Sequence, residues 1–181
     1  HNFSGGYSGP VSTSNALLRS LNLPVLQVLN YGASEALSAR LNNAGLQLRW
    51  PRNASANKAL VLGGVGVKLE SLVSAYSALI NQGQAITPRY RKDTPLAQRF
   101  LLEPQSAWVI QNILRQQQQP GRLSEHLSAH QDSNIGWKTG TSYDFRDAWV
   151  IGFAGRHIIG VGIGRADAVS VANNTGNNHA L

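Results

Sequence analysis

One short segment of the sequence, residues 135–142, alternates strictly between two kinds of side chain. Trp137, Thr139 and Thr141 alternate with glycine, lysine and serine, which is the period-2 pattern of a β-strand. Such a strand can offer the Lys138 ammonium and the threonine hydroxyls to an anionic ligand. Its backbone edge can also pair with an extended peptide. The segment therefore predicts a strand that is suited to binding a peptide with a negative charge.

Two apolar runs follow this segment, at residues 147–153 and 158–164. Residues 154–157 lie between them and include Gly155, which gives this connection the composition of a turn. β-Branched runs joined by a short, glycine-containing connection are typical of a β-hairpin. We therefore expect three antiparallel strands, near residues 135–142, 147–153 and 157–164.

The chain ahead of these strands has the pattern of helices. Helical spacing of apolar residues predicts five helices, near residues 15–21, 24–30, 33–43, 69–80 and 107–114. A break is expected at residues 22–24 because Pro24 disfavours a continuous helix, and Gly83 is suited to cap the fourth helix. Pro104 is suited to the first turn of the fifth. Helices followed by an antiparallel sheet predict an α+β fold in which the helices pack on the sheet.

The composition is that of a globular protein and narrows the range of partners. Of 181 residues, 42% are hydrophobic and 14% are charged. No apolar run approaches the roughly 20 residues of a membrane span. No cysteine is present, which excludes disulfides, thiol nucleophiles and cysteine metal sites. The net charge is +7, but the basic residues are scattered apart from a small cluster at 89–92, and aromatic residues do not interleave with them. A nucleic-acid partner is therefore not expected, and a basic surface would suit anionic lipid or a cell-wall polymer.

A second group of polar residues, Ser20-Leu21-Asn22, lies at the expected break between the first two helices. Taken alone, serine and asparagine at this place are most simply explained as helix-capping residues. Their position, 118 residues before Lys138 with a helical stretch between, gives them a second interpretation, which depends on the resemblance described next.

Together these motifs resemble a known family. Ser20-Leu21-Asn22 and Lys138-Thr139-Gly140 are similar, in order and approximate separation, to the Ser-x-Asn and Lys-Thr-Gly motifs of penicillin-binding transpeptidases. Residues 18–25, 62–67 and 137–153 resemble bifunctional class A penicillin-binding proteins, and residues 143–149 resemble their penicillin-binding protein 1C branch.

The resemblance also suggests how the chain is divided. It covers most of residues 9–165 and implies one incomplete transpeptidase domain over residues 1–181. We expect a helical part at 9–130, a sheet part at 133–165 and a poorly matching tail at 166–181. The implied fold is the one shared with serine β-lactamases, a five-stranded sheet covered by helices on both faces and completed by sequence outside this chain.

One expected motif is missing from its place. The family carries Ser-x-x-Lys, whose serine is the nucleophile, ahead of Ser-x-Asn, yet residues 1–19 contain no such motif. The one Ser-x-x-Lys of the chain, Ser55 to Lys58, comes after Ser20 and is most simply a loop or a helix N-cap. We therefore expect the nucleophile to lie on sequence outside this chain, and the chain alone to be inactive.

The resemblance implies a role for each remaining site residue. Ser20, Lys138 and Thr141 are implied as catalytic residues: Ser20 as a proton relay, Lys138 as the source of positive potential, and the Thr141 N–H as part of an oxyanion hole. Asn22, Thr139, Gly140 and Thr141 are implied as substrate-binding residues, which would hold the backbone and terminal carboxylate of a peptidoglycan stem peptide.

The implied activity is serine-type D-Ala-D-Ala transpeptidation, in a parent protein that also carries a peptidoglycan glycosyltransferase domain. Stem peptides and β-lactam antibiotics are the implied partners. The implied location is the periplasmic side of the bacterial inner membrane, with membrane contact made only through missing N-terminal sequence. No cofactor is implied, and self-association of the chain is expected.

Two alternatives remain at this point. The same fold could serve as a non-catalytic sensor or scaffold that binds β-lactams or peptidoglycan. A β-lactam hydrolase is a second alternative, although none of Glu35, Glu70, Glu103 and Glu125 is followed by the Leu-Asn pattern of the deacylating glutamate. A metal site is not expected, because His126 and His130, four residues apart, have no acidic residue in a ligand pattern.

Overall fold

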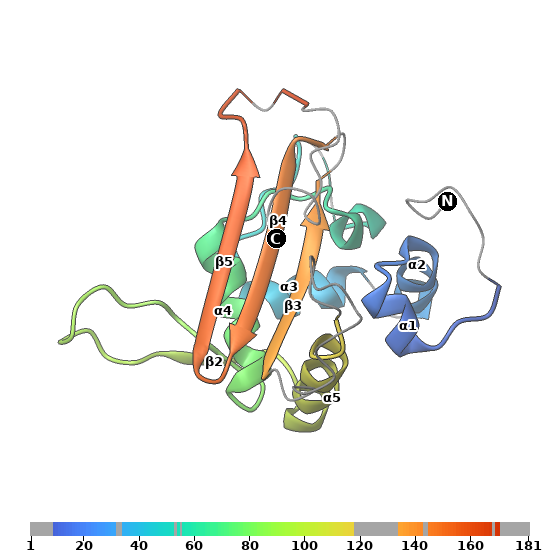
Figure 1. Ribbon diagram of the computed structural model, residues 1–181. Coiled ribbons are helices and arrows are strands. Elements are labelled where there is room, and N and C mark those ends of the chain that lie inside the picture. Colours follow the sequence, from blue (N-terminus) through green and yellow to red (C-terminus); the bar gives the residue numbers. More distant parts are fainter. Residues whose placement is uncertain are drawn as a thin grey trace, which may run out of the picture.

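The computed structural model describes residues 9–31, 34–52, 54, 56–117, 134–142, 145–167, 169 and 170. Helices and antiparallel strands make up the α+β fold that the sequence predicted (Figure 1). In chain order the elements are α1 (Thr13–Leu18), α2 (Asn22–Tyr31), α3 (Ser34–Asn43), the 3₁₀-helix η1 (Lys58–Leu62), α4 (Leu69–Ile80), β1 (Gln84–Ile86), β2 (Gln98–Phe100), α5 (Pro104–Leu114), β3 (Ile135–Thr141), β4 (Asp147–Ala154) and β5 (His157–Gly164).

The three expected strands form one antiparallel sheet in the order β3-β4-β5. Their bounds differ from the prediction by one residue at most. Ala154 pairs with His157, so the β4–β5 loop has only two residues, and the first of them, Gly155, has a φ of +55°. A two-residue hairpin needs such a positive φ at its first position, and glycine adopts it without strain. The glycine in the turn sequence thus fixes the register of the hairpin.

One face of this sheet packs against α4, which lies behind it in Figure 1, and against α5, which lies beside the lower end of β3. Leu79 of α4, Leu114 of α5 and Phe153 of β4 form a buried cluster between the layers. Gly160 lets α4 approach β5 closely, because a Cβ at this position would lie 2.6 Å from Val73 and 2.8 Å from Leu69. The side chains of α4 and α5 therefore cover the helix-facing side of the sheet.

A second, two-stranded sheet was not predicted. β1 and β2 pair antiparallel, with Ala85 opposite Arg99. Two serines of α4 bind the backbone of β1: Ser74 Oγ donates to the Ile86 carbonyl at 2.7 Å, and the Ile86 N–H donates to Ser77 Oγ at 2.7 Å. The loop between the strands projects away from the rest of the fold (Figure 1). The expected helical part of the chain therefore contains strands that depend on tertiary hydrogen bonds.

The predicted break between the first two helices was displaced. In the structure, α1 ends at Leu18 and α2 begins at Asn22. The break therefore lies at residues 19–21 and not at residues 22–24. Pro24 lies inside the first turn of α2, where a backbone N–H has no partner within the helix and proline is tolerated. No helix within the described ranges is long and apolar enough to cross a membrane.

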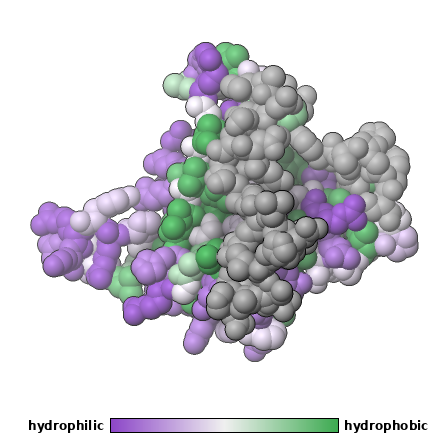
Figure 2. Space-filling view, viewed as in Figure 1, coloured by the Kyte–Doolittle hydropathy of each residue, from purple (hydrophilic) through white to green (hydrophobic). Residues whose placement is uncertain are grey.

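The other face of the sheet carries apolar side chains that include a buried cluster of Trp137, Ala148 and Val150. On β5, Ile159 and Val161 point to the same face and are 64% and 38% exposed. Figure 2 shows hydrophobic surface along the β5 side of this face. Within the described residues β5 pairs only with β4, so its outer backbone edge adds hydrogen-bonding groups to this apolar surface.

We predict that the chain self-associates through the β5 face, because exposed apolar residues beside an open strand edge favour edge-to-edge pairing. Light scattering at micromolar concentration, together with binding of a hydrophobic dye, measures this. Replacing Ile159 by Lys should reduce both signals, whereas replacing Leu96, which is exposed in the projecting loop, should leave them unchanged. A monomer that binds no dye contradicts the prediction.

Candidate active site

The turn that carries Ser20 is a helix C-cap of the Schellman type. The Ser20 N–H donates to the Leu17 carbonyl at 3.2 Å, and the Leu21 N–H donates to the Ala16 carbonyl at 2.9 Å. This pattern places Ser20 at the position that normally adopts the left-handed conformation, and its φ is indeed +52°. The end of α1 therefore determines the backbone of Ser20.

Serine is an unfavourable residue for such a position. Glycine is usual there, since a left-handed backbone costs a residue with a Cβ atom roughly 1–2 kcal/mol. Burial of Leu21 and Ala16, each 6% exposed, accompanies the turn and offsets this cost. The chain thus keeps a hydroxyl where glycine would be more stable, which indicates that the hydroxyl serves a function.

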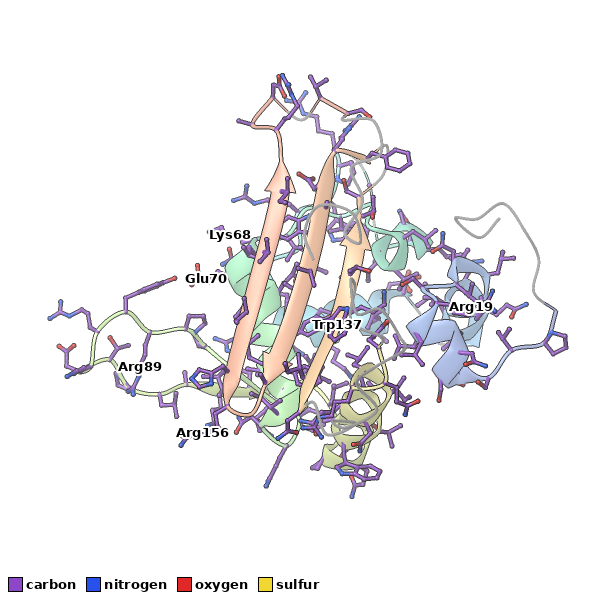
Figure 3. The ribbon with its side chains drawn as sticks, in the orientation of Figure 1. Arg19, Lys68, Glu70, Arg89, Trp137 and Arg156 are labelled. Carbon is purple, nitrogen blue, oxygen red and sulfur yellow. The ribbon has the colours of Figure 1, made fainter. Side chains whose placement is uncertain are left out.

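The side chain of Lys138, on strand β3, reaches the Ser20 hydroxyl. It pairs with Ile151 of β4, so the alternation of β3 directs its side chain to the face covered by the helices. Its Nζ donates to Ser20 Oγ and, at 2.9 Å, to the Thr139 carbonyl. The predicted approach of Ser20 and Lys138, 118 positions apart, is confirmed. In Figure 3 the labels Arg19 and Trp137 mark the two elements that meet here, the α1–α2 turn and β3.

The charge state of Lys138 is affected by its surroundings. Burial lowers the pKa of Lys138 below its ordinary value of 10.5. Desolvation acts in this direction because it disfavours the ammonium relative to the neutral amine. A lysine with a lowered pKa that donates to a serine hydroxyl can both supply positive potential and exchange a proton with that hydroxyl.

The other expected site residues lie along β3 and the start of α2. Thr139 and Thr141 are half-buried. Because they alternate with Lys138 along β3, their side chains lie on the opposite face of the sheet from the lysine. They can therefore contact the same ligand as Lys138 only around the edge of the strand. A Cβ at Gly140 would meet only Trp149, at 3.9 Å, so the protein itself leaves this position open. Asn22 is the half-buried first residue of α2.

A further glycine of the site had no assigned role in the sequence analysis. Gly63 has a φ of +79°, and a Cβ placed on it would lie 3.6 Å from the Thr141 carbonyl. The 62–67 segment therefore packs against the end of β3. The neighbouring Asn57 caps η1, since its Oδ1 accepts from the Ala59 N–H at 2.8 Å. Asn57 lies within the Ser55 to Lys58 motif, but Ser55 itself is outside the described residues, so its interpretation as a loop or N-cap residue stays a prediction.

The histidines considered as metal ligands lie mostly outside the described part of the chain. His157 is exposed at the start of β5. His126, His130 and Glu125 lie outside the described residues. In the part of the chain that is described, no three histidine or carboxylate side chains come together as metal ligands.

The chain is similar to known proteins over most of its length. Residues 24–163 match the penicillin binding protein transpeptidase domain family. Penicillin-binding protein 1C of Escherichia coli (strain K12) is 42% identical over 97% of this chain and 22% of that protein. Penicillin-binding protein 1A of Clostridium acetobutylicum is 30% identical over 91% of this chain and 22% of that protein. The chain thus spans about a fifth of the length of these relatives.

The fold is shared with a solved structure. The crystal structure of penicillin-binding protein 1A from Haemophilus influenzae has a TM-score of 0.76 to this chain, at 18% identity, and the match covers 97% of this chain and 33% of that one. This confirms the expected fold class, and the sequence matches confirm the resemblance on which it was based.

We predict that Ser20→Gly is more stable than Ser20→Ala by about 1 kcal/mol, because both variants lose the hydroxyl but only alanine keeps the strained Cβ. Urea unfolding of the two variants measures the difference. The same pair of substitutions at Ser106, an exposed residue of α5, should show the opposite order, because alanine is favoured over glycine within a helix. Equal stability of the two Ser20 variants contradicts a strained turn.

We also predict that the free energy of unfolding of the native chain rises, relative to Lys138→Met, as the pH increases from the lowered pKa toward 10.5. In that interval the unfolded state binds the proton that the folded state has released, so deprotonation favours folding. Urea unfolding from pH 7 to 11 measures this, and Lys58→Met is the control for loss of one exposed charge. A difference that stays constant with pH contradicts the desolvation of Lys138.

Proposed function

This chain belongs to the penicillin binding protein transpeptidase domain family, and we propose that it is the part of a serine D-Ala-D-Ala transpeptidase that binds and protonates the substrate. The contact between Lys138 Nζ and Ser20 Oγ carries this proposal. It joins an ammonium of lowered pKa to a hydroxyl that is both donor and acceptor, at the open end of a strand suited to hold a peptide. The serine that forms the acyl-enzyme is proposed to lie on sequence that this chain does not contain.

The proposed substrate is the D-Ala-D-Ala end of a peptidoglycan stem peptide. The backbone edge of β3 and the Asn22 side chain would pair with the peptide, and the Thr139 and Thr141 hydroxyls would bind its terminal carboxylate. Lys138 would add positive potential for that carboxylate. Gly140 leaves the space through which the substrate backbone approaches the strand.

The proposed chemistry is acyl transfer in two steps. A serine attacks the carbonyl of the penultimate D-alanine, and the Thr141 N–H stabilises the oxyanion that forms. Ser20 relays the proton that the attacking serine hydroxyl loses to the nitrogen of the departing D-alanine, with Lys138 holding the Ser20 hydroxyl in place. The amine of a second stem peptide then takes the acyl group and releases the serine. β-Lactams would be trapped by the same groups because they imitate the acyl-D-alanyl-D-alanine end.

The parent protein is proposed to act in peptidoglycan synthesis in the bacterial cell envelope, on the periplasmic side of the inner membrane. We further propose that it carries a glycosyltransferase domain, as bifunctional relatives of this family do. The sensor or scaffold alternative and the hydrolase alternative differ from this proposal in what happens to a β-lactam, and this makes β-lactams the right probe.

We predict that the chain alone forms no covalent adduct with a reactive β-lactam, whereas the natural full-length protein forms one at a serine upstream of Ser20. Intact-mass spectrometry with peptide mapping measures both. An adduct on Ser55 of the chain contradicts the proposed location of the nucleophile. No adduct on the full-length protein supports the sensor or scaffold, and rapid release of the hydrolysed drug supports the hydrolase.

In the full-length protein, Ser20→Ala should lower the rate of acylation by about 10²- to 10⁴-fold, the usual contribution of a proton-transfer group. Ser12→Ala, which removes a hydroxyl that caps α1, controls for effects on the fold. An acylation rate of Ser20→Ala equal to that of Ser12→Ala contradicts the proposed role of Ser20.

A further inference from the structure

The C-terminal turn of α5 makes a direct contact with the turn that carries Ser20. Helical hydrogen bonding continues beyond Leu114, since the Gln117 N–H donates to the Leu114 carbonyl at 3.3 Å. This brings the Gln117 side chain to the end of α1, where its Nε2 donates to the Leu18 carbonyl at 3.1 Å. The two residues are 99 positions apart in the sequence.

The backbone hydrogen bonds that cap α1 provide no donor for the Leu18 carbonyl. The last four carbonyls of a helix have no partner within it. Here the carbonyls of residues 15, 16 and 17 accept from the N–H groups of Arg19, Leu21 and Ser20, respectively. The carbonyl of Leu18, the last residue of α1, accepts from Gln117. Gln117 therefore completes the set of hydrogen bonds that fixes the direction of the chain as it enters Ser20.

The same end of α5 is also fixed to the sheet. Leu114 packs in the buried cluster with Phe153, and the Arg115 guanidinium lies over the Phe153 ring, 5.9 Å from its centre. Phe153 pairs with Gly136, two residues before Lys138, and the ring occupies the space that a Cβ at Gly136 would need. One turn of helix is thus packed against the strand of Lys138 and hydrogen-bonded to the turn of Ser20.

We propose that Gln117 is a positioning residue of the site, which sets the place of Ser20 Oγ relative to Lys138 Nζ. The inference rests on the proposed function, because it concerns the proton relay assigned to Ser20. Ser20 is held in a strained conformation by its cap, so loss of the bond to Leu18 lets the turn relax and moves the hydroxyl. A displacement of about 1 Å at a catalytic group can lower a rate by as much as 10²-fold.

The variants that test this differ in one hydrogen bond. Gln117→Ala removes the donor to Leu18, and Gln117→Lys keeps a donor on a side chain of similar length. Gln116→Ala is the matched control, since Gln116 is exposed and its Nε2 donates within its own helix, to the Asn112 carbonyl at 3.3 Å. Gln117→Asn, whose side chain is one methylene too short to reach Leu18, replaces Gln117→Ala if that variant does not fold.

The first readout is the backbone of Ser20 in the chain itself. The ¹³Cα and ¹³Cβ chemical shifts of Ser20 report its φ and ψ, so Gln117→Ala should move them away from left-handed values. Gln117→Lys and Gln116→Ala should leave them in place. Unchanged Ser20 shifts in Gln117→Ala overturn the proposal.

The second readout is the rate of β-lactam acylation in the full-length protein. Gln117→Ala should lower the acylation rate by about 10- to 100-fold, with little change in the affinity for the drug before the covalent step and a fall in Tm of only a few degrees. Gln117→Lys should recover most of the rate, and Gln116→Ala should stay within about twofold of the native protein.

The two readouts separate the possible failures. An acylation rate of Gln117→Ala equal to that of Gln116→Ala overturns the positioning role, even if the Ser20 shifts move. If the native full-length protein is not acylated at all, the proposed function fails, and the Ser20 shifts then decide by themselves whether Gln117 sets the conformation of the turn.

Discussion

The left-handed backbone of Ser20 is the constraint on which the geometry of the site depends, because it turns the chain from α1 into α2 and at the same time directs a hydroxyl at β3. The cap supplies two backbone hydrogen bonds and buries Leu21, which together hold a conformation that costs roughly 1–2 kcal/mol when the residue carries a Cβ atom. A glycine would form the same turn more easily but would remove the hydroxyl that accepts from Lys138, leaving the lysine with the Thr139 carbonyl. The proposed role of the hydroxyl would account for the presence of the less stable residue.

The position of Lys138 depends in turn on how closely the layers pack. Glycines at 136 and 160 provide the space for the Phe153 ring and for the side chains of α4, so the sheet packs closely against the helices. Lys138 extends from the sheet into the same interface, where its ammonium loses water and finds the hydroxyl of Ser20. The packing that stabilises the domain is therefore also the source of the desolvation that lowers the pKa of the lysine.

The sequence was most informative where structure is local. Strict alternation and the Gly155 turn predicted β3, β4 and β5 to within one residue, because a two-residue hairpin fixes its own register. It failed for β1 and β2, whose three-residue strands depend on Ser74 and Ser77 of α4. Ser20 alone would have been explained as a capping residue, and its approach to Lys138 could be predicted only from the family resemblance. Gln117 was missed because a contact between residues 99 positions apart leaves no periodic pattern in the sequence.

Three features of the site each oppose folding, and they lie together. Ser20 has a strained backbone, Lys138 is a partly desolvated cation, and β3, within the described residues, pairs along only one of its edges. Each would be removed if stability alone determined the sequence, since glycine, an apolar residue or a neighbouring strand would fold more favourably. Single features of this kind occur elsewhere, as in the positive φ of Gln82 and Phe145, but at the site all three lie together. Conflicts of this kind are expected to concentrate where a protein binds or reacts. Their coincidence at the contact between Ser20 and Lys138 is a physical reason, independent of the family resemblance, to place the function there.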